Sequence, residues 1–259
     1  MSAIHKYPRT RHILDSALQP GDEDLDRAGF EEIAGQHLVV EEKVDGANAA
    51  ISFDADGRLL LQSRGHYLTG GPRERHFSYF KRWSHELHDR LWQALGPRYI
   101  VYGEWVYAKH TIFYDALPHY FLEFDVLDIA TNKFLSTDRR RALLAGLFIH
   151  RVPVLNEGTI ASAFDLKALL GPSSYKSLHW RNKLAEAATM PPHDPELVQR
   201  QTDPSDLMEG LYIKIEEDGR VVDRFKYVRA DFVALVIDSE SHWQSRPILP
   251  NQLRQNVSL

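Results

Sequence analysis

A lysine followed at close spacing by an aspartate, a glycine and an asparagine stands at the end of a strand-like run. The segment reads Lys43-Val-Asp45-Gly46-Ala-Asn48. A tight Asp-Gly turn directly after a strand holds a side chain in a fixed direction, so the amine of Lys43 is a candidate group for chemistry over a pocket. The alternative is a plain hairpin in which Asp45 and Gly46 only reverse the chain. Both interpretations stay open from this segment alone.

Further short motifs follow Lys43 in a definite order. They are SRG (63–65), YGEW (102–105), FLEFDVLD (121–128), MEGLYIK (208–214) and RFKYV (224–228). Together with the lysine segment, this series resembles the covalent nucleotidyltransferase superfamily of ATP-dependent ligases and mRNA capping enzymes. Within the superfamily it is most similar to ATP-dependent RNA ligases, in the bacteriophage RNA ligase 2-like branch. The resemblance extends from residue 41 to about residue 229.

The resemblance implies that Lys43 is the catalytic nucleophile. It would attack the α-phosphate of ATP, release pyrophosphate and carry AMP as a lysyl-adenylate, from which AMP passes to an RNA 5′-phosphate before a 3′-hydroxyl displaces it. A lysine amine with a pKa of about 10.4 is almost fully protonated at neutral pH. It needs a cationic environment to become a nucleophile, and we expect Mg²⁺, Arg224 and Lys226 to provide one.

The same resemblance assigns roles to two glutamates. It implies that Glu104, in YGEW, contacts the nucleotide and that Glu209, in MEGLYIK, binds the catalytic metal, Mg²⁺ or Mn²⁺. Carboxylate oxygens and waters suit such an ion, which neutralises charge on the attacked phosphate. A solvated charge at the end of a strand is the alternative for either glutamate.

Seven more residues match positions at which the family contacts the nucleotide. Phe124 is expected to stack on adenine through its flat apolar face, with core packing as the alternative. Arg224 and Lys226 alternate along a predicted strand and are expected to point into one groove. The family has two lysines at these positions. Here Arg224 stands at the first of them, so a planar guanidinium with several donors replaces a compact ammonium. The others are Glu42, Asn48, Arg64 and Lys214.

Asn48 favours an RNA ligase over other members of the superfamily. DNA ligases and capping enzymes usually have arginine at this position and append an OB-fold domain, for which the residues after Arg229 are too few. A DNA ligase or a guanylyltransferase remains an alternative, as does a noncatalytic module that binds nucleic-acid ends. The presence of Lys43, Glu104 and Glu209 weighs against the noncatalytic module.

Hydrophobic periodicity and turn signals predict the elements that position these residues. Strand-like runs at 37–44, 49–53 and 58–64 are separated by Asp-Gly turns, which predicts an antiparallel meander. An apolar stripe at three- and four-residue spacing predicts a helix over 77–95. Further strands are predicted at 99–107 and 120–128, with a polar loop at 109–118 between them.

The second half of the chain has helical signals before a final hairpin. Helices are predicted after the N-cap candidates Ser136 and Ser162, and within 173–201. The run 211–228 predicts a hairpin that turns at Asp218-Gly219.

Composition limits the class of protein. The chain has 259 residues, of which 43% are hydrophobic and 26% charged, as in soluble globular proteins. It has no cysteine, which excludes disulfides, thiolate nucleophiles and cysteine zinc sites. We find no secretion signal or membrane span and expect a cytoplasmic protein. A net charge of −5 argues against nonspecific coating of nucleic acid.

These observations predict an α+β fold, with an adenylyltransferase domain of antiparallel sheets flanked by helices and no full OB-fold domain. We expect a peripheral segment at 1–35, the ligase domain at 36–237 and a tail at 238–259. The P-loop and Rossmann motifs are missing, so ATP must be held in another way. The expected partners are RNA with 5′-phosphate and 3′-hydroxyl ends and a separate end-healing kinase or phosphatase. Nicked duplex, cleaved tRNA loop and single strand all remain possible substrates.

Overall fold

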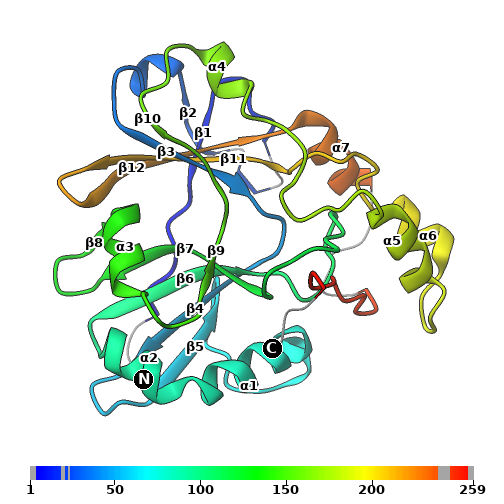
Figure 1. Cartoon of the computed structure of the whole chain (residues 1–259), viewed down its shortest axis with the longest axis horizontal. Helices are drawn as coiled ribbons and strands as arrows, with labels where there is room; N and C mark the ends of the chain where they lie inside the picture. Colours follow the sequence, from blue (N-terminus) through cyan, green and yellow to red (C-terminus); the bar gives the residue numbers. More distant parts are fainter. Residues whose placement is uncertain (1–3, 19–20, 23, 239–245, 256–259) are drawn as a thin grey trace.

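The computed structural model of the chain describes residues 4–18, 21–22, 24–238 and 246–255. In this part of the chain the strands form one hydrogen-bonded sheet, whose main path has the order β10-β3-β11-β12-β8-β7-β6-β4-β5. The short strand β8 (Lys133–Leu135) joins two layers, which are drawn one above the other in Figure 1. The predicted α+β architecture of antiparallel strands flanked by helices is confirmed.

The upper layer contains the strand that ends at the candidate nucleophile. Its main strands are β10 (Val154–Gly158), β3 (Leu38–Lys43), β11 (Gly210–Glu217) and β12 (Arg220–Val228). Strands β1 (Arg11–Ile13) and β2 (Arg27–Ala28) extend this layer from β12 by parallel pairing. Part of the segment that we expected to be peripheral therefore belongs to the sheet, and Ile13 is fully buried.

The lower layer carries the remaining strands. They are β7 (Phe121–Asp128), β6 (Tyr99–Trp105), β4 (Ala47–Phe53), β5 (Leu59–Ser63) and the short β9 (His150–Arg151). Helices α1 (Ser78–Glu86) and α2 (His88–Leu95) cover this layer, and their apolar faces supply Phe80 and Leu91 to the core. The helix predicted over 77–95 is therefore present, but it is divided at Leu87.

The other helices occur between or after the strands along the chain. They are η1 (Phe30–Glu32), η2 (Pro72–Phe77), α3 (Thr137–Leu143), α4 (Ala163–Lys167), α5 (Trp180–Ala188), α6 (Pro195–Arg200) and α7 (Ala230–Asp238). The side chains of Ser136 and Ser162 accept N–H groups at the starts of α3 and α4, which confirms both predicted N-caps. In the described ranges, no helix has the length and apolar character needed to cross a membrane.

The predicted final hairpin is confirmed, whereas the predicted first meander is wrong. Strands β11 and β12 turn at Asp218 and Gly219, whose φ angles of 50° and 75° suit a two-residue turn. Strand β4 pairs with β5 as expected, but β3 pairs with β10 and β11 in the other layer. The chain therefore crosses between layers directly after Lys43, because Asp45 and Gly46 contact distant residues instead of closing a hairpin.

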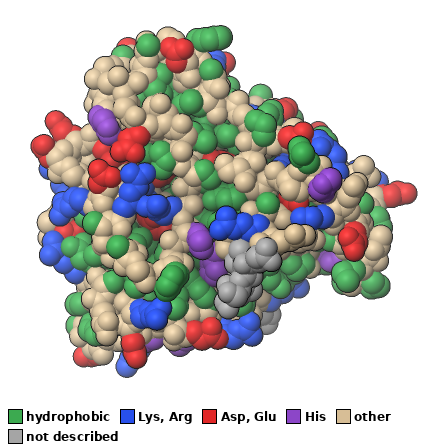
Figure 2. All heavy atoms as spheres, viewed as in Figure 1, with side chains coloured by type: hydrophobic (Ala, Val, Ile, Leu, Met, Phe, Trp, Pro, Cys, Tyr) green, Lys and Arg blue, Asp and Glu red, His purple; other side chains and the backbone are tan. Residues whose placement is uncertain are grey.

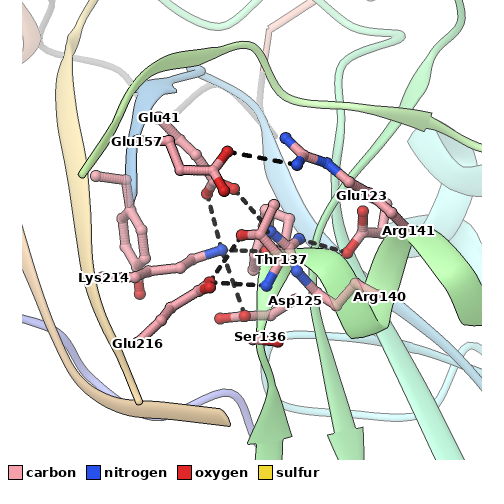
Figure 3. Close-up of polar contacts among 12 residues, drawn as sticks. Glu41, Glu123, Asp125, Ser136, Thr137, Arg140, Arg141, Glu157, Lys214 and Glu216 are labelled. Atoms are coloured by element: carbon pink, nitrogen blue, oxygen red, sulfur yellow. Dashed lines mark hydrogen bonds and ion pairs between the residues drawn. The ribbon is translucent and has the colours of Figure 1, made fainter. Parts of the chain in front are cut away.

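A buried network of charged side chains connects the two layers (Figure 3). Arg140 of α3 places Nη2 2.8 Å from Glu41 Oε1 of β3 and Nη1 2.6 Å from Glu123 Oε1 of β7. Lys214 of β11 places Nζ 2.8 Å from Glu41 Oε2 and 3.3 Å from Asp125 Oδ1 of β7. Each cation therefore bridges carboxylates from both layers.

The same cations hold the backbone of the lower layer. Arg140 and Lys214 both donate hydrogen bonds to the carbonyl oxygen of Phe124. Arg140 also donates to Thr137 Oγ1 at 3.0 Å, and Thr137 donates in turn to Glu216 Oε1 of β11 at 2.7 Å. The network therefore holds β3 and β11 against β7.

Replacing Arg140 with methionine should lower the free energy of unfolding by about 3–5 kcal/mol, because Glu41 and Glu123 would stay buried without this partner. Guanidinium denaturation measures the change. Arg139→Met is the matched control, since Arg139 is the exposed neighbour in the same helix and its loss should cost under about 0.5 kcal/mol. Equal effects of the two substitutions would contradict a structural role for the network.

Candidate active site

A cavity of about 980 Å³ lies where the two layers meet, next to the end of β3. Eight of the ten residues that we predicted for the site line it, and they come from both layers. They are Glu42, Lys43, Asn48, Arg64, Glu104, Phe124, Glu209 and Lys226. Within the described residues, Lys214 and Arg224 are outside this lining.

The amine of Lys43 lies against carboxylates, which differs from the cationic environment that we predicted. Its Nζ is 2.6 Å from Glu209 Oε1. Burial opposes the charge on the amine, but Glu209 and Glu104 outweigh that effect and raise the pKa of Lys43. In this arrangement the amine is a protonated ammonium, so it must lose a proton before it can attack.

Glu104 and Glu209 place two buried carboxylates beside this amine. Burial, with further repulsion from Glu209, raises the pKa of Glu104 to about 8, and burial also raises the pKa of Glu209. Asn48 lies opposite Glu104 in the β4–β6 pairing, and its Oδ1 is buried without a hydrogen-bond partner. The oxygen atoms of Glu104, Glu209 and Asn48 therefore lie together with little positive charge beside them, and such oxygen ligands suit a hard divalent cation.

A metal ion would depend on ligands beyond the protein. Among the described residues, no group of three histidine, aspartate or glutamate side chains is arranged to hold an ion. Mg²⁺ is commonly bound by one or two carboxylates together with phosphate oxygens and waters. Glu104 and Glu209 meet that requirement only when a phosphate is present as well.

Asp45 attaches the crossing between the layers to a buried loop, and Gly46 packs closely against the end of β6. Asp45 Oδ2 accepts the N–H groups of Thr111 and Ile112 at 2.7 and 2.8 Å. At Gly46 a Cβ atom would lie 2.8 Å from Val106 Cγ1 and 2.9 Å from the Trp105 carbonyl oxygen, so a larger residue would clash with the end of β6. The loop at 109–118, which we predicted to be polar, is instead almost entirely buried, and its residues Ile112, Tyr114 and Leu117 pack in a hydrophobic core.

Phe124 packs against a second aromatic ring that also lines the cavity. Its ring centroid is 6.4 Å from that of Tyr212 of β11, with 38° between the planes. Tyr7 packs edge-on against Phe124 at 5.1 Å, and its hydroxyl lies 2.7 Å from that of Tyr212. Neither tyrosine was predicted from the sequence. Tyr212 nevertheless has a detectable signal, because strand alternation puts it on the same face as Lys214.

Lys226 lines the cavity and is paired with Asp22 of the N-terminal segment. Burial and the nearby charge of Lys43 lower the pKa of Lys226. His12 Nε2 lies 3.3 Å from the same carboxylate of Asp22. Asp22 stands in an acidic stretch of the sequence, where nothing distinguishes it from its neighbours.

Arg224 is held in a different environment from Lys226. Its guanidinium carbon lies 4.1 Å from the centre of the Phe134 ring, and Nη2 is 3.7 Å from Asp125 Oδ2. Lys214 is fully buried in the network that connects the layers. The structure therefore brings Lys226 to the cavity but directs the other two cations to its supporting wall.

Glu42 and Arg64 line the cavity from different layers. Glu42 accepts hydrogen bonds from Ser173 Oγ at 2.5 Å and from the Ser174 N–H at 3.0 Å, so its carboxylate is bound by the segment before α5. Arg64 follows β5 in the lower layer, and its charge acts to lower the pKa of Glu104. Nucleotide contact by either residue stays a prediction.

Comparison with known proteins places this site in a known fold. A sequence model of the RNA ligase family matches residues 36–228. A Naegleria gruberi RNA ligase mutant solved with ATP and Mn is 19% identical, with a TM-score of 0.52, over 80% of this chain and 53% of that chain. Another mutant, with AMP and Mn, is 18% identical with a TM-score of 0.53, over 89% and 57% of the two chains.

The Naegleria gruberi RNA ligase with PPi is 20% identical, with a TM-score of 0.50, over 80% of this chain and 54% of that chain. At these identities the likeness concerns the fold. The chain spans little more than half the length of these ligase chains. No curated protein matches the chain.

Replacing Asp45 with alanine should lower the free energy of unfolding by about 2–4 kcal/mol, because two buried N–H groups would lose their acceptor. Urea denaturation measures the loss. Asp54→Ala is the matched control: Asp54 also accepts two N–H groups, but in an exposed turn where water replaces it. A loss as small as that of the control would show that Asp45 does not hold the loop.

Proposed function

This chain belongs to the RNA ligase family, and we propose that it is an ATP-dependent RNA ligase that joins 5′-phosphate and 3′-hydroxyl ends through a lysyl-adenylate on Lys43. The observation that carries the proposal is the cavity in which the Lys43 amine, the carboxylates of Glu104 and Glu209, and an aromatic pair converge. The Naegleria ligases with ATP, AMP and Mn support the same chemistry.

The adenine of ATP would lie between Phe124 and Tyr212. Stacked atoms are separated by about 3.5 Å, so a base between two rings needs a gap of about 7 Å. The ring centroids are 6.4 Å apart with 38° between the planes, so the rings would have to move apart and become parallel to admit the base. Flat apolar faces bind a base without reading its edges, which leaves specificity for adenine to other groups.

The phosphates would lie between Lys226 and Lys43. The α-phosphate would take the place of the Asp22 carboxylate on Lys226. Glu209 lies within hydrogen-bonding distance of Lys43 Nζ and is positioned to receive its proton. The Nζ–phosphorus bond would then form as the bond from phosphorus to the pyrophosphate oxygen breaks.

Glu104 and Glu209 would also hold a divalent cation, Mg²⁺ or Mn²⁺. Such an ion would neutralise charge on the α-phosphate and on the departing pyrophosphate. The raised pKa of Glu104 supports this assignment, since two buried carboxylates next to each other favour any added positive charge.

The remaining steps follow from the proposed adenylate. The RNA 5′-phosphate would take AMP from Lys43, and the 3′-hydroxyl of the second strand would displace AMP as the new phosphodiester bond forms. The protein would act in RNA repair in the cytoplasm, where an end-healing kinase or phosphatase prepares ends of this kind. The likeness to the bacteriophage RNA ligase 2-like branch rests on Asn48 and stays part of this proposal.

Incubation with ATP labelled at its α-phosphate, followed by a denaturing gel, should label the wild-type protein. Lys43→Ala should lose the label completely, because no other amine takes this position. Lys133→Ala is the control, since Lys133 is exposed on β8, and it should be labelled like the wild type. Label from GTP would indicate a guanylyltransferase, and no label from any nucleotide would overturn the proposal.

Sealing of nicked RNA but not nicked DNA would separate an RNA ligase from a DNA ligase.

Replacing Tyr212 with alanine should weaken ATP binding about 10- to 100-fold, because stacking of one base on an aromatic ring contributes about 1–3 kcal/mol. Calorimetry in a Lys43→Ala background measures binding without reaction. Tyr212→Phe keeps the ring and should bind ATP within about threefold of the parent. If Tyr212→Ala binds equally well, the base does not lie between the two rings.

A further inference from the structure

The N-terminal segment places a carboxylate on a lysine of the cavity. Figure 1 shows this segment passing from the lower layer to the upper one, where β1 pairs with β12 and His12 stands opposite Lys226. Lys226 lines the cavity, and its Nζ forms an ion pair with Asp22, which lies between β1 and β2 in the chain. Acidic and basic side chains lie next to one another on the face drawn in Figure 2, and this mixture continues inside the cavity.

A series of hydrogen bonds that begins and ends on β12 holds Asp22 in place. The Val228 N–H donates to Ser16 Oγ at 2.9 Å, and Ser16 Oγ lies 2.7 Å from His12 Nδ1. His12 Nε2 lies 3.3 Å from Asp22 Oδ2, the same oxygen that accepts from Lys226. Burial and the charge of Lys226 lower the pKa of His12. A neutral His12 that donates from Nε2 and accepts from Ser16 at Nδ1 satisfies all of these bonds.

The carboxylate of Asp22 is charged and has partners besides Lys226. Asp22 is buried, and burial alone would raise the pKa of its carboxyl, but the hydrogen bond and the charge of Lys226 outweigh burial and lower this pKa. Arg9 Nη2 lies 3.4 Å from the second oxygen, Asp22 Oδ1. His12 and Arg9 therefore still hold the carboxylate when the amine of Lys226 binds another anion.

A carboxylate in this position opposes a phosphate at the same amine. In the proposed mechanism the α-phosphate binds Lys226 in the place of Asp22, and two anions beside one ammonium repel each other. Asp22 is part of the chain, so its effective concentration at Lys226 is fixed and does not fall on dilution. A nucleotide that reaches Lys226 must therefore first displace this carboxylate.

We infer that Asp22 is an autoinhibitory counter-ion, which competes with the nucleotide phosphate for Lys226 and so limits the affinity for ATP. The inference rests on the proposed function, in which this phosphate binds Lys226. In the absence of a nucleotide, Asp22 neutralises a buried ammonium that the charge of Lys43 repels. When ATP binds, the ion pair of Lys226 is exchanged and not newly formed, which reduces the free energy gained on binding.

Asp22→Asn should bind ATP about tenfold or more tightly than the parent, because the nucleotide would no longer have to break a charged hydrogen bond. Calorimetry in a Lys43→Ala background measures this binding without reaction. Asp26→Asn is the matched control, since Asp26 is an exposed carboxylate between the same two strands, and it should bind ATP within about twofold of the parent. Weaker or unchanged binding by Asp22→Asn would overturn the inference, because a residue that only orients Lys226 lowers the affinity when it is removed. An equal gain in the control would overturn it as well.

Adenosine separates competition at the phosphate from a change in the aromatic slot. It carries the base and the ribose without a phosphate, so Asp22→Asn and the parent should bind adenosine equally. A gain for adenosine as large as that for ATP would overturn the inference, because the substitution would then act on the slot. Thermal melting shows whether each variant is folded, and Asp22→Ala removes the same carboxylate if Asp22→Asn is not folded.

Failure of the inference and failure of the proposed function give different results. Wild-type protein that is labelled by ATP, together with an Asp22→Asn variant that binds ATP no more tightly than its parent, would overturn only the competition by Asp22. No label on the wild type and no binding of ATP by any variant would overturn the proposed function and this inference together.

Discussion

The buried pairing of cations with carboxylates between the two layers is the interaction on which the cavity depends. Arg140 and Lys214 lose nearly all contact with water, and that loss is compensated only when the layers bring every partner within ion-pair distance. Both cations also bond to the carbonyl oxygen of Phe124, and both contact Glu41, two residues before Lys43. The network therefore sets the strand of the candidate nucleophile against the ring expected to hold the base.

The cavity keeps its own charges paired with groups of the chain. Glu209 forms an ion pair with Lys43, and Asp22 forms one with Lys226. The proposed mechanism places phosphate next to both lysines. Such pairing lowers the cost of burying a lysine, but it also leaves the Lys43 amine protonated. A nucleotide must therefore exchange with these carboxylates, and the phosphates that bring negative charge into the cavity are the groups that can do so.

A single turn sequence serves two structural purposes here. An aspartate and a glycine after a strand commonly form a hairpin turn. In this protein Asp45 binds the backbone of the buried loop 109–118, and Gly46 allows the end of β6 to approach closely. The crossing between layers that follows Lys43 depends on both, so residues more than sixty positions away determine how the nucleophile is presented.

The sequence by itself determined the features that depend on neighbours a few residues apart, such as the N-cap at Ser136 and the turn at Asp218-Gly219. The order of its motifs also indicated the family, because that order is a property of the chain and not of its folding. Tertiary structure alone decided that β3 leaves the meander and that Tyr212 faces Phe124. Strand-like segments have many acceptable partners, and the choice among them is made by burial and charge pairing between residues far apart in the chain.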